Sequence, residues 1–205
     1  MIGVILFIVM AGVELLLPIY AQNVREMMLR ESGLLLLPGA LLMGVSGVIS
    51  GKIYDNFGGR YLIRIGFLWI AVVLSFLTMV LTARASYFLL MGIYAMLMTG
   101  VGFMMTPITA LAMASLPSSM MNYASSMTTT IHTLGMSMGG ALLITLMTIT
   151  ADYSSVSFSV NMLKGFQASF WALTVIAAGG FFLSFFVPYN QGSAQPLVSE
   201  SRQAS

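Results

Sequence analysis

Six long apolar segments limit what this chain can fold into more than any other feature. A helix needs about 20 mostly apolar residues to cross a bilayer. The segments that qualify cover residues 2–21, 33–54, 61–82, 87–105, 121–150 and 166–187. Only 7% of the residues are charged, whereas soluble domains carry roughly 25%. The pattern therefore predicts an all-α integral membrane protein with six spanning helices.

The connections between these segments are too short to hold a soluble domain. We therefore expect a single six-helix bundle over residues 1–189. Residues 190–205 are polar and rich in Ser and Gln, which predicts a disordered cytoplasmic tail. Apolar sequence begins at Ile2 without a basic residue before it, unlike a secretory signal. The first segment is expected to be a spanning helix whose upstream neighbour is missing.

Composition excludes several classes of function. The net charge of +2 is thinly spread, which predicts no nucleic-acid partner. Because the chain contains no cysteine, disulfides and thiolate metal sites are excluded, and we expect neither a metal nor a cofactor. The 19 methionines are interpreted as flexible apolar packing. The alternative is an adaptable binding surface for varied ligands.

The positions of the basic residues bear on orientation in the membrane. Basic residues are enriched in cytoplasmic connections. With six spans, one side holds Lys52, Arg60, Arg64 and Arg202, and the other holds Arg25, Arg30, Arg84 and Lys164. The counts are equal, but three bases of the first group crowd one connection. We therefore expect that connection to face the cytoplasm.

A faint internal repeat relates the two halves of the chain. The second segment contains Gly47 and Gly51, and the fifth contains Gly135 and Gly139, each pair four residues apart. Small residues at this spacing let membrane helices approach closely. Each pair lies in the middle segment of a set of three. The repeat predicts two three-helix units of inverted topology, which is the plan of many secondary transporters.

The connection between the second and third segments carries a recognisable motif. Residues 51–60 (GKIYDNFGGR) resemble the signature of the major facilitator superfamily. The matching positions are Gly51, Asp55, Gly58 and Arg60, whereas Asn56 and Gly59 stand where bases are expected. The glycines predict a tight turn over residues 51–62. The resemblance implies that Asp55 belongs to a conformational latch, and the alternative is a generic charged hairpin.

The resemblance extends beyond this motif to the second half of fourteen-helix drug:proton antiporters. It is carried by residues 16–22 (LLPIYAQ), 37–40 (LPGA), 134–141 (LGMSMGGA) and a stretch with Gly100, Gly102 and Pro107. It implies the C-terminal half of a multidrug efflux permease in the plasma or inner membrane. Such a protein is not an enzyme. It exports amphipathic or cationic molecules by alternating access, and a proton gradient drives it without a cofactor.

The resemblance also implies a partner and a cavity. One bundle cannot alternate access alone, so the partner is a missing N-terminal half or a second copy. The first, second, fourth and fifth helices are expected to line the central cavity. The third and sixth are expected to lie outside it.

Three polar residues are candidates for the cavity. Glu14 lies within the first apolar segment, where a charge is costly. It is interpreted either as a titrating or cation-attracting group or as a structural acid. His132, the only histidine, is either a proton carrier or a packing residue that bridges helices. Gln22, at the end of the first segment, is the third candidate.

Two other classes of protein are alternatives. Ser46 and His132, with glycines near both, resemble the Ser–His pair of rhomboid proteases, and such a pair is a workable nucleophile and base. Other rhomboid landmarks are missing, and Ser46 fits a glycine-rich packing face. The second alternative is a six-helix structural or assembly protein that does not transport.

Overall fold

A backbone in lipid must satisfy its own hydrogen bonds, and an apolar segment does so by forming a helix. The computed structural model describes residues 2–57, 59–82, 85–114, 121–150 and 158–185. Within these ranges every helix is long and apolar enough to span a membrane, so the chain is a multi-pass membrane protein. The helices are α1 (Ile2–Asn23), α2 (Leu29–Phe57), α3 (Gly59–Val80), α4 (Tyr87–Ala114), α5 (Met121–Thr150) and α6 (Phe158–Ser184). The predicted six-helix fold is confirmed.

Several helix ends differ from the sequence-based expectation. The fourth segment was expected to end at residue 105, but α4 continues through Pro107 to Ala114. Proline inside a spanning helix is tolerated because neighbouring groups satisfy the carbonyl that it frees. The sixth was expected to begin at residue 166, but α6 begins at Phe158. Polar residues there suggested a connection, yet a helix can continue beyond the membrane.

The prediction of a turn over residues 51–62 is wrong in its extent. α2 continues through Gly51 and Asp55 to Phe57, and α3 begins at Gly59. Gly58 lies outside the described residues. A single glycine costs a helix only about 1 kcal/mol, so Gly51 does not end α2. Most of the signature therefore lies on the last two turns of a 29-residue helix.

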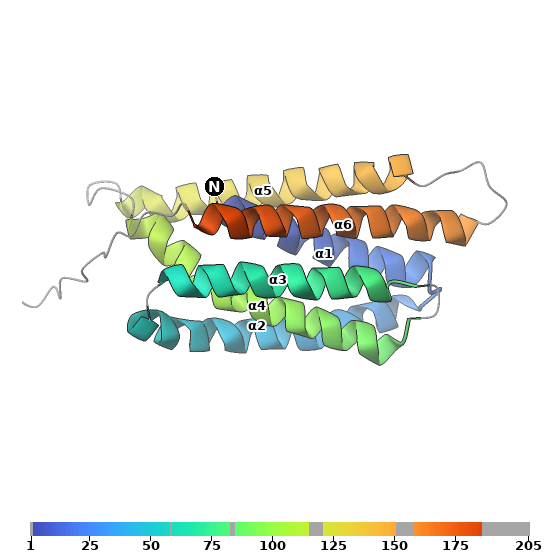
Figure 1. Ribbon diagram of the computed structural model, residues 1–205, viewed down its shortest axis with the longest axis horizontal. Coiled ribbons are helices and arrows are strands. Elements are labelled where there is room, and N and C mark those ends of the chain that lie inside the picture. Colours follow the sequence, from blue (N-terminus) through green and yellow to red (C-terminus); the bar gives the residue numbers. More distant parts are fainter. Residues whose placement is uncertain (1, 58, 83–84, 115–120, 151–157, 186–205) are drawn as a thin grey trace, which may run out of the picture.

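The helices form two layers. α2 packs on α4, α4 contacts α1, and α1 packs on α5, which gives a layer in the order α2–α4–α1–α5. α3 and α6 pack on each other and cover one face of this layer. In Figure 1 they lie in front of α4 and α1. α3 and α6 do not cover the opposite face of the four-helix layer.

The contacts between helices show the inverted repeat. When α1, α2 and α3 are exchanged for α4, α5 and α6, every pair of helices in contact maps onto another pair in contact. For example, α1 packs on α5 as α4 packs on α2, and α1 contacts α6 as α4 contacts α3. Because three spans separate equivalent helices, α1 and α4 run in opposite directions (Figure 1). The bundle is therefore built from two inverted three-helix units.

Close helix contacts occur where glycine leaves space. On α5, a Cβ added at Gly139 would lie 2.9 Å from the Ile8 Cα of α1, and Gly135 faces Val4. On α4, a Cβ at Gly102 would lie 2.5 Å from the Met43 carbonyl oxygen of α2. These are the two equivalent interfaces of the repeat. The structure thus places glycine where the two helices of each pair lie close together.

The α2–α4 interface also contains hydrogen bonds between the helices. The Ser50 hydroxyl donates to the Phe103 carbonyl at 2.6 Å, and the Thr106 hydroxyl donates to the Gly47 carbonyl at 3.1 Å. Hydrogen bonds between helices contribute on the order of 0.6–2 kcal/mol each in membranes. Gly100 faces the other way, toward Trp69 of α3. α4 is therefore held closely on both sides.

A glycine substitution tests this close packing. Gly102→Ala is expected to lower the free energy of unfolding by about 1–3 kcal/mol, the usual cost of overpacking. Its new Cβ would meet backbone as well as the Ser46 hydroxyl. Gly44→Ala is the matched control, because nothing lies within 4 Å of a Cβ there. Thermal unfolding in detergent measures both, and equal midpoints for the two variants would contradict the interface.

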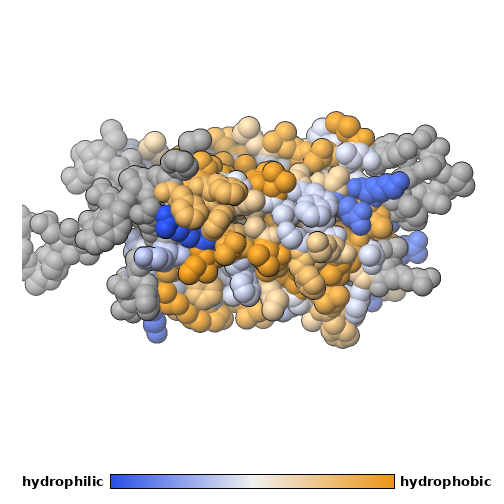
Figure 2. Space-filling model, in the orientation of Figure 1, coloured by the Kyte–Doolittle hydropathy of each residue, from blue (hydrophilic) through white to orange (hydrophobic). Residues whose placement is uncertain are grey.

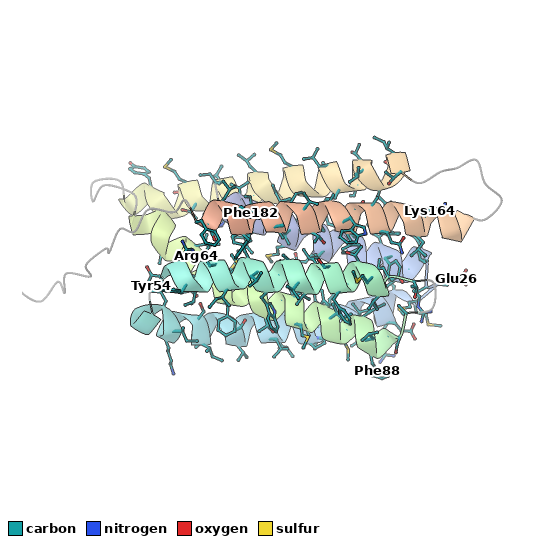
Figure 3. All side chains as sticks on the ribbon, in the orientation of Figure 1. Glu26, Tyr54, Arg64, Phe88, Lys164 and Phe182 are labelled. Atoms are coloured by element: carbon teal, nitrogen blue, oxygen red, sulfur yellow. The ribbon has the colours of Figure 1, made fainter. Side chains whose placement is uncertain are left out.

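Polar groups gather at the two ends of the bundle. Figure 2 shows a mostly hydrophobic middle on this face, with hydrophilic residues toward both ends. Arg64 and Tyr54 lie toward one end, and Glu26 and Lys164 toward the other (Figure 3). The Arg64 guanidinium lies 4.4 Å from the centre of the Phe185 ring, a cation–π contact next to the end of α6. This distribution fits a bundle that spans the bilayer along its long axis.

Cysteine labelling tests the expected orientation. Tyr61→Cys and Ser86→Cys place thiols at exposed positions on opposite ends, in a chain that has no cysteine of its own. Neither substitution removes a basic residue that directs insertion. In intact cells we expect an impermeant thiol reagent to label residue 86 and to spare residue 61 until the membrane is opened. Labelling of residue 61 but not of residue 86 in intact cells would show that the orientation in the membrane is opposite to the expected one.

Candidate transport site

One side of α1 is less buried than the rest of the helix and forms a partly exposed stripe. Met10, Glu14, Pro18 and Gln22 recur every fourth residue and are all partly exposed. Residues four apart lie on the same side of a helix. Leu16 lies on another side and is fully buried. Glu14 therefore stands on a partly open side of α1, in the middle of the span.

Tyr94 of α4 is buried. A Cβ at Gly39 of α2 would lie 2.3 Å from the Tyr94 ring, so glycine makes room for that ring. Tyr94 thus packs against α2 within the four-helix layer. No feature of the sequence marks Tyr94 as a candidate.

His132 lies against the first turns of α1. Its ring stacks on Phe7 with 3.7 Å between ring centres, and its Nε2 lies 3.9 Å from a Cβ placed at Gly3. His132 thus bridges α5 to α1 by stacking. Phe7 and Glu14 are seven residues apart, or about 10 Å along a helix. The structure does not bring His132 and Glu14 into contact.

Gln22 lies where α1 joins α2. Its amide donates to the Ser32 hydroxyl at 3.0 Å, and that hydroxyl donates to the Leu29 carbonyl at 2.9 Å. These bonds tie the end of α1 to the start of α2. Gln22 shares a helix face with Glu14 but is two turns away from it.

The signature motif packs against α4. A Cβ at Gly51 would lie 3.9 Å from the Thr106 side chain. The Tyr54 ring lies over Gly59, where an added Cβ would also come within 3.4 Å of Pro107. The side chains of Asp55 and Arg60, and Gly58 entirely, lie outside the described residues. The described part of the motif therefore connects α2, α3 and the proline-containing part of α4.

α5 has an exposed row of hydroxyl groups that the sequence analysis missed. Ser126, Thr130, Thr133 and Ser137 follow one another at intervals of three or four residues, and all are exposed. Each hydroxyl donates to a carbonyl one turn earlier on α5, at 2.8–3.3 Å. Their donors are therefore satisfied, and their oxygens remain available as acceptors. The spacing alone could have revealed this row.

The geometry does not support a Ser–His protease. Ser46 lies in α2 and His132 in α5, and these two helices make no contact. The Ser46 hydroxyl donates to the Met43 carbonyl at 3.0 Å and faces Gly102. Within the described ranges, His, Cys, Asp and Glu form no cluster of three that could hold a metal ion.

The fold and the sequence agree with one family of known proteins. The model of the Major Facilitator Superfamily matches residues 1–140. The chain belongs to the major facilitator superfamily. Its six helices form one half of a major facilitator fold, and the family consists of membrane transporters.

Three curated proteins are similar to this chain over most of its length. Two uncharacterized MFS-type transporters of Bacillus subtilis, YcnB and YhcA, are each 35% identical to the chain, over 196 and 159 residues. The lincomycin resistance protein LmrB of Listeria monocytogenes is 28% identical over 141 residues. The matches cover 95%, 74% and 69% of this chain but 41%, 30% and 30% of the relatives. The chain thus spans less than half the length of these relatives.

Proposed function

We propose that this chain is the C-terminal half of a proton-coupled multidrug efflux transporter of the fourteen-helix type. It exports amphipathic or cationic small molecules across the plasma or inner membrane by alternating access. The observation that carries the proposal is Glu14, a partly exposed acid within a span of a major facilitator bundle. An acid in that position attracts cations. Similarity to a lincomycin resistance protein supports drug export.

Transport requires a second bundle, because alternating access works by rocking two bundles around a midplane site. Both edge helices of the four-helix layer expose apolar rows that such a bundle would cover. The rows are Leu41, Val45 and Val48 on α2 and Leu134, Met138 and Leu142 on α5. The partner is an N-terminal half or a second copy of this chain.

The remaining candidates take different roles in this proposal. His132, stacked against α1, carries protons near the expected cytoplasmic end. Gln22 lines the outer end of the path, beyond Glu14. The signature motif latches α2 and α3 at the cytoplasmic end, and Asp55 supplies the acid. A proton gradient supplies the driving force.

Drug accumulation in cells tests the proposed function. The complete protein is expressed in bacteria that lack their own efflux pumps, and the uptake of a fluorescent amphipathic cation is followed. We expect accumulation below that of cells with an empty vector, and a protonophore should abolish the difference. Equal accumulation with and without the protein would reject drug export. A difference that survives the protonophore would reject proton coupling.

A further inference from the structure

One turn of α2 and one turn of α4 exchange a reciprocal pair of hydrogen bonds. The Ser50 hydroxyl of α2 donates to the Phe103 carbonyl at 2.6 Å, and the Thr106 hydroxyl of α4 donates to the Gly47 carbonyl at 3.1 Å. In contrast, Thr99 of α4 donates to a carbonyl one turn earlier on its own helix. Ser50 is also fully buried, so its bond is shielded from water. The pair fastens α2 to α4 over one turn.

Pro107 explains why the Phe103 carbonyl accepts this bond. Proline has no amide hydrogen, so the carbonyl four residues earlier in the helix loses its usual donor. For Pro107, which lies inside α4, that carbonyl belongs to Phe103. A carbonyl without a donor is costly inside a bilayer, because lipid offers it no hydrogen bond. The Ser50 hydroxyl therefore takes the place of the amide hydrogen that α4 lacks.

α4 parts from α2 next to this contact. In Figure 1 the last part of α4 diverges from α2 and ends near the start of α5. Because proline removes one bond of the helix, α4 can bend at Pro107. On its other side Pro107 lies against the start of α3, 3.4 Å from a Cβ placed at Gly59, and the Tyr54 ring covers the same glycine. The signature segment of α2 and the proline of α4 therefore lie at one junction of three helices.

We propose that Ser50 is a positioning residue that holds α4 at Pro107 in one arrangement against α2, so that the two helices move as one unit during transport. The consequence for transport rests on the proposed function, whereas the positioning can be measured without it. Alternating access requires each bundle to move as a body around the central site. Without the Ser50 hydroxyl, α4 is free to bend at Pro107, and fewer molecules hold the arrangement that transport requires.

The test compares four forms of the complete transporter: wild type, Ser50→Ala, Pro107→Ala and the double variant. Pro107→Ala supplies an amide hydrogen to the Phe103 carbonyl, so the Ser50 hydroxyl is no longer needed there. Export of a fluorescent amphipathic cation is measured over a range of concentrations and corrected for the protein in the membrane. We expect Ser50→Ala alone to lower the maximal rate by about fivefold, the effect of one hydrogen bond. The half-saturating concentration should stay within about twofold of the wild-type value.

The double variant separates this role from a general loss of packing. In the Pro107→Ala background, Ser50→Ala should change the maximal rate by less than about twofold, because the carbonyl already has a donor. If Ser50→Ala lowers the rate by the same factor in both backgrounds, the hydroxyl does not act through the freed carbonyl. That result would overturn the inference.

A nitroxide label at Ala110→Cys gives a readout that does not depend on transport. Residue 110 lies on α4 beyond Pro107 and is partly exposed. The label is attached to purified complete protein from which any other cysteines have been removed. We expect Ser50→Ala to make the label more mobile when Pro107 is present and to leave its mobility unchanged in the Pro107→Ala background. An unchanged spectrum in Ser50→Ala would overturn the positioning role at any transport rate.

Ser46→Ala is the matched control. Ser46 lies one turn before Ser50 on α2 and is also buried, but its hydroxyl donates to the Met43 carbonyl of its own helix at 3.0 Å. The substitution therefore removes a hydroxyl from the same interface without breaking a bond to α4. The export rate and the label spectrum should both stay at their wild-type values. If Ser46→Ala lowers the rate as much as Ser50→Ala, the inference is overturned.

The remaining outcomes distinguish failure of this inference from failure of the proposed function. If Ser50→Ala exports the cation at the wild-type rate, its role in transport is overturned while drug export stands. If the label responds as expected in all four forms but wild type exports no cation, the positioning of α4 by Ser50 is supported and the proposed function fails.

Discussion

Replacing Glu14 with Gln is expected to weaken export of cationic drugs by roughly tenfold or more, while export of neutral drugs stays near the wild-type rate. Glutamine keeps the size and hydrogen-bonding groups of the side chain but carries no charge. A hydrogen bond to a charged group contributes about 1.5–3 kcal/mol, which corresponds to the expected factor. Because Glu14 is partly exposed on α1, the substitution should not disturb packing.

The measurement is export of a cationic and a neutral drug from the same cells, corrected for the amount of protein in the membrane. Glu26→Gln is the matched control. It neutralises an exposed acid in the connection between α1 and α2, away from the spans (Figure 3). If Glu14→Gln and wild type export both drugs equally, Glu14 is a structural acid.

Asp55→Asn is the second substitution with a large expected effect. Transport should fall by about tenfold, because Asn lacks the negative charge that the proposed latch requires to hold one conformation. Expression should stay near normal, since residue 55 lies in the last turn of α2. The described part of the motif already connects three helices through Tyr54, Gly59 and Pro107. A change in this contact would therefore reach α4, which carries Tyr94.

Transport rate and membrane abundance must be measured together for this variant. Glu26→Gln again controls for the loss of one acid. Unchanged transport by Asp55→Asn would mean that the motif is a hairpin without a latch. If the amount of Asp55→Asn protein in the membrane falls as much as transport does, Asp55 is needed for folding and not for a latch.

The fold could be predicted from the sequence because lipid leaves few choices for an apolar chain. The six segments predicted the six-helix bundle, and the faint glycine repeat indicated its two inverted units. The helix ends were less predictable. Hydropathy marks where a segment enters lipid, whereas α2 and α6 continue as helices into polar sequence. Pro107 lies inside α4, because in a bundle a neighbouring helix can satisfy the carbonyl that a proline frees.

The candidate site was only partly predictable. Glu14 is visible in the sequence because an acid within an apolar run is rare. Tyr94 carries no such signal, since its position against α2 depends on the space at Gly39. Likewise, the sequence alone could not show that His132 stacks on Phe7 or that Gln22 bonds to Ser32. These relations depend on the order of helices in the layer.

Transport by purified protein in liposomes is the most informative single measurement. The complete protein is reconstituted, a pH gradient is imposed without ATP, and accumulation of a cationic drug is followed for wild type and Glu14→Gln. We expect accumulation by wild type that requires the gradient and is largely lost in Glu14→Gln. Accumulation no greater than in empty liposomes, or accumulation that is independent of the gradient and of Glu14, would contradict proton-coupled export through this bundle.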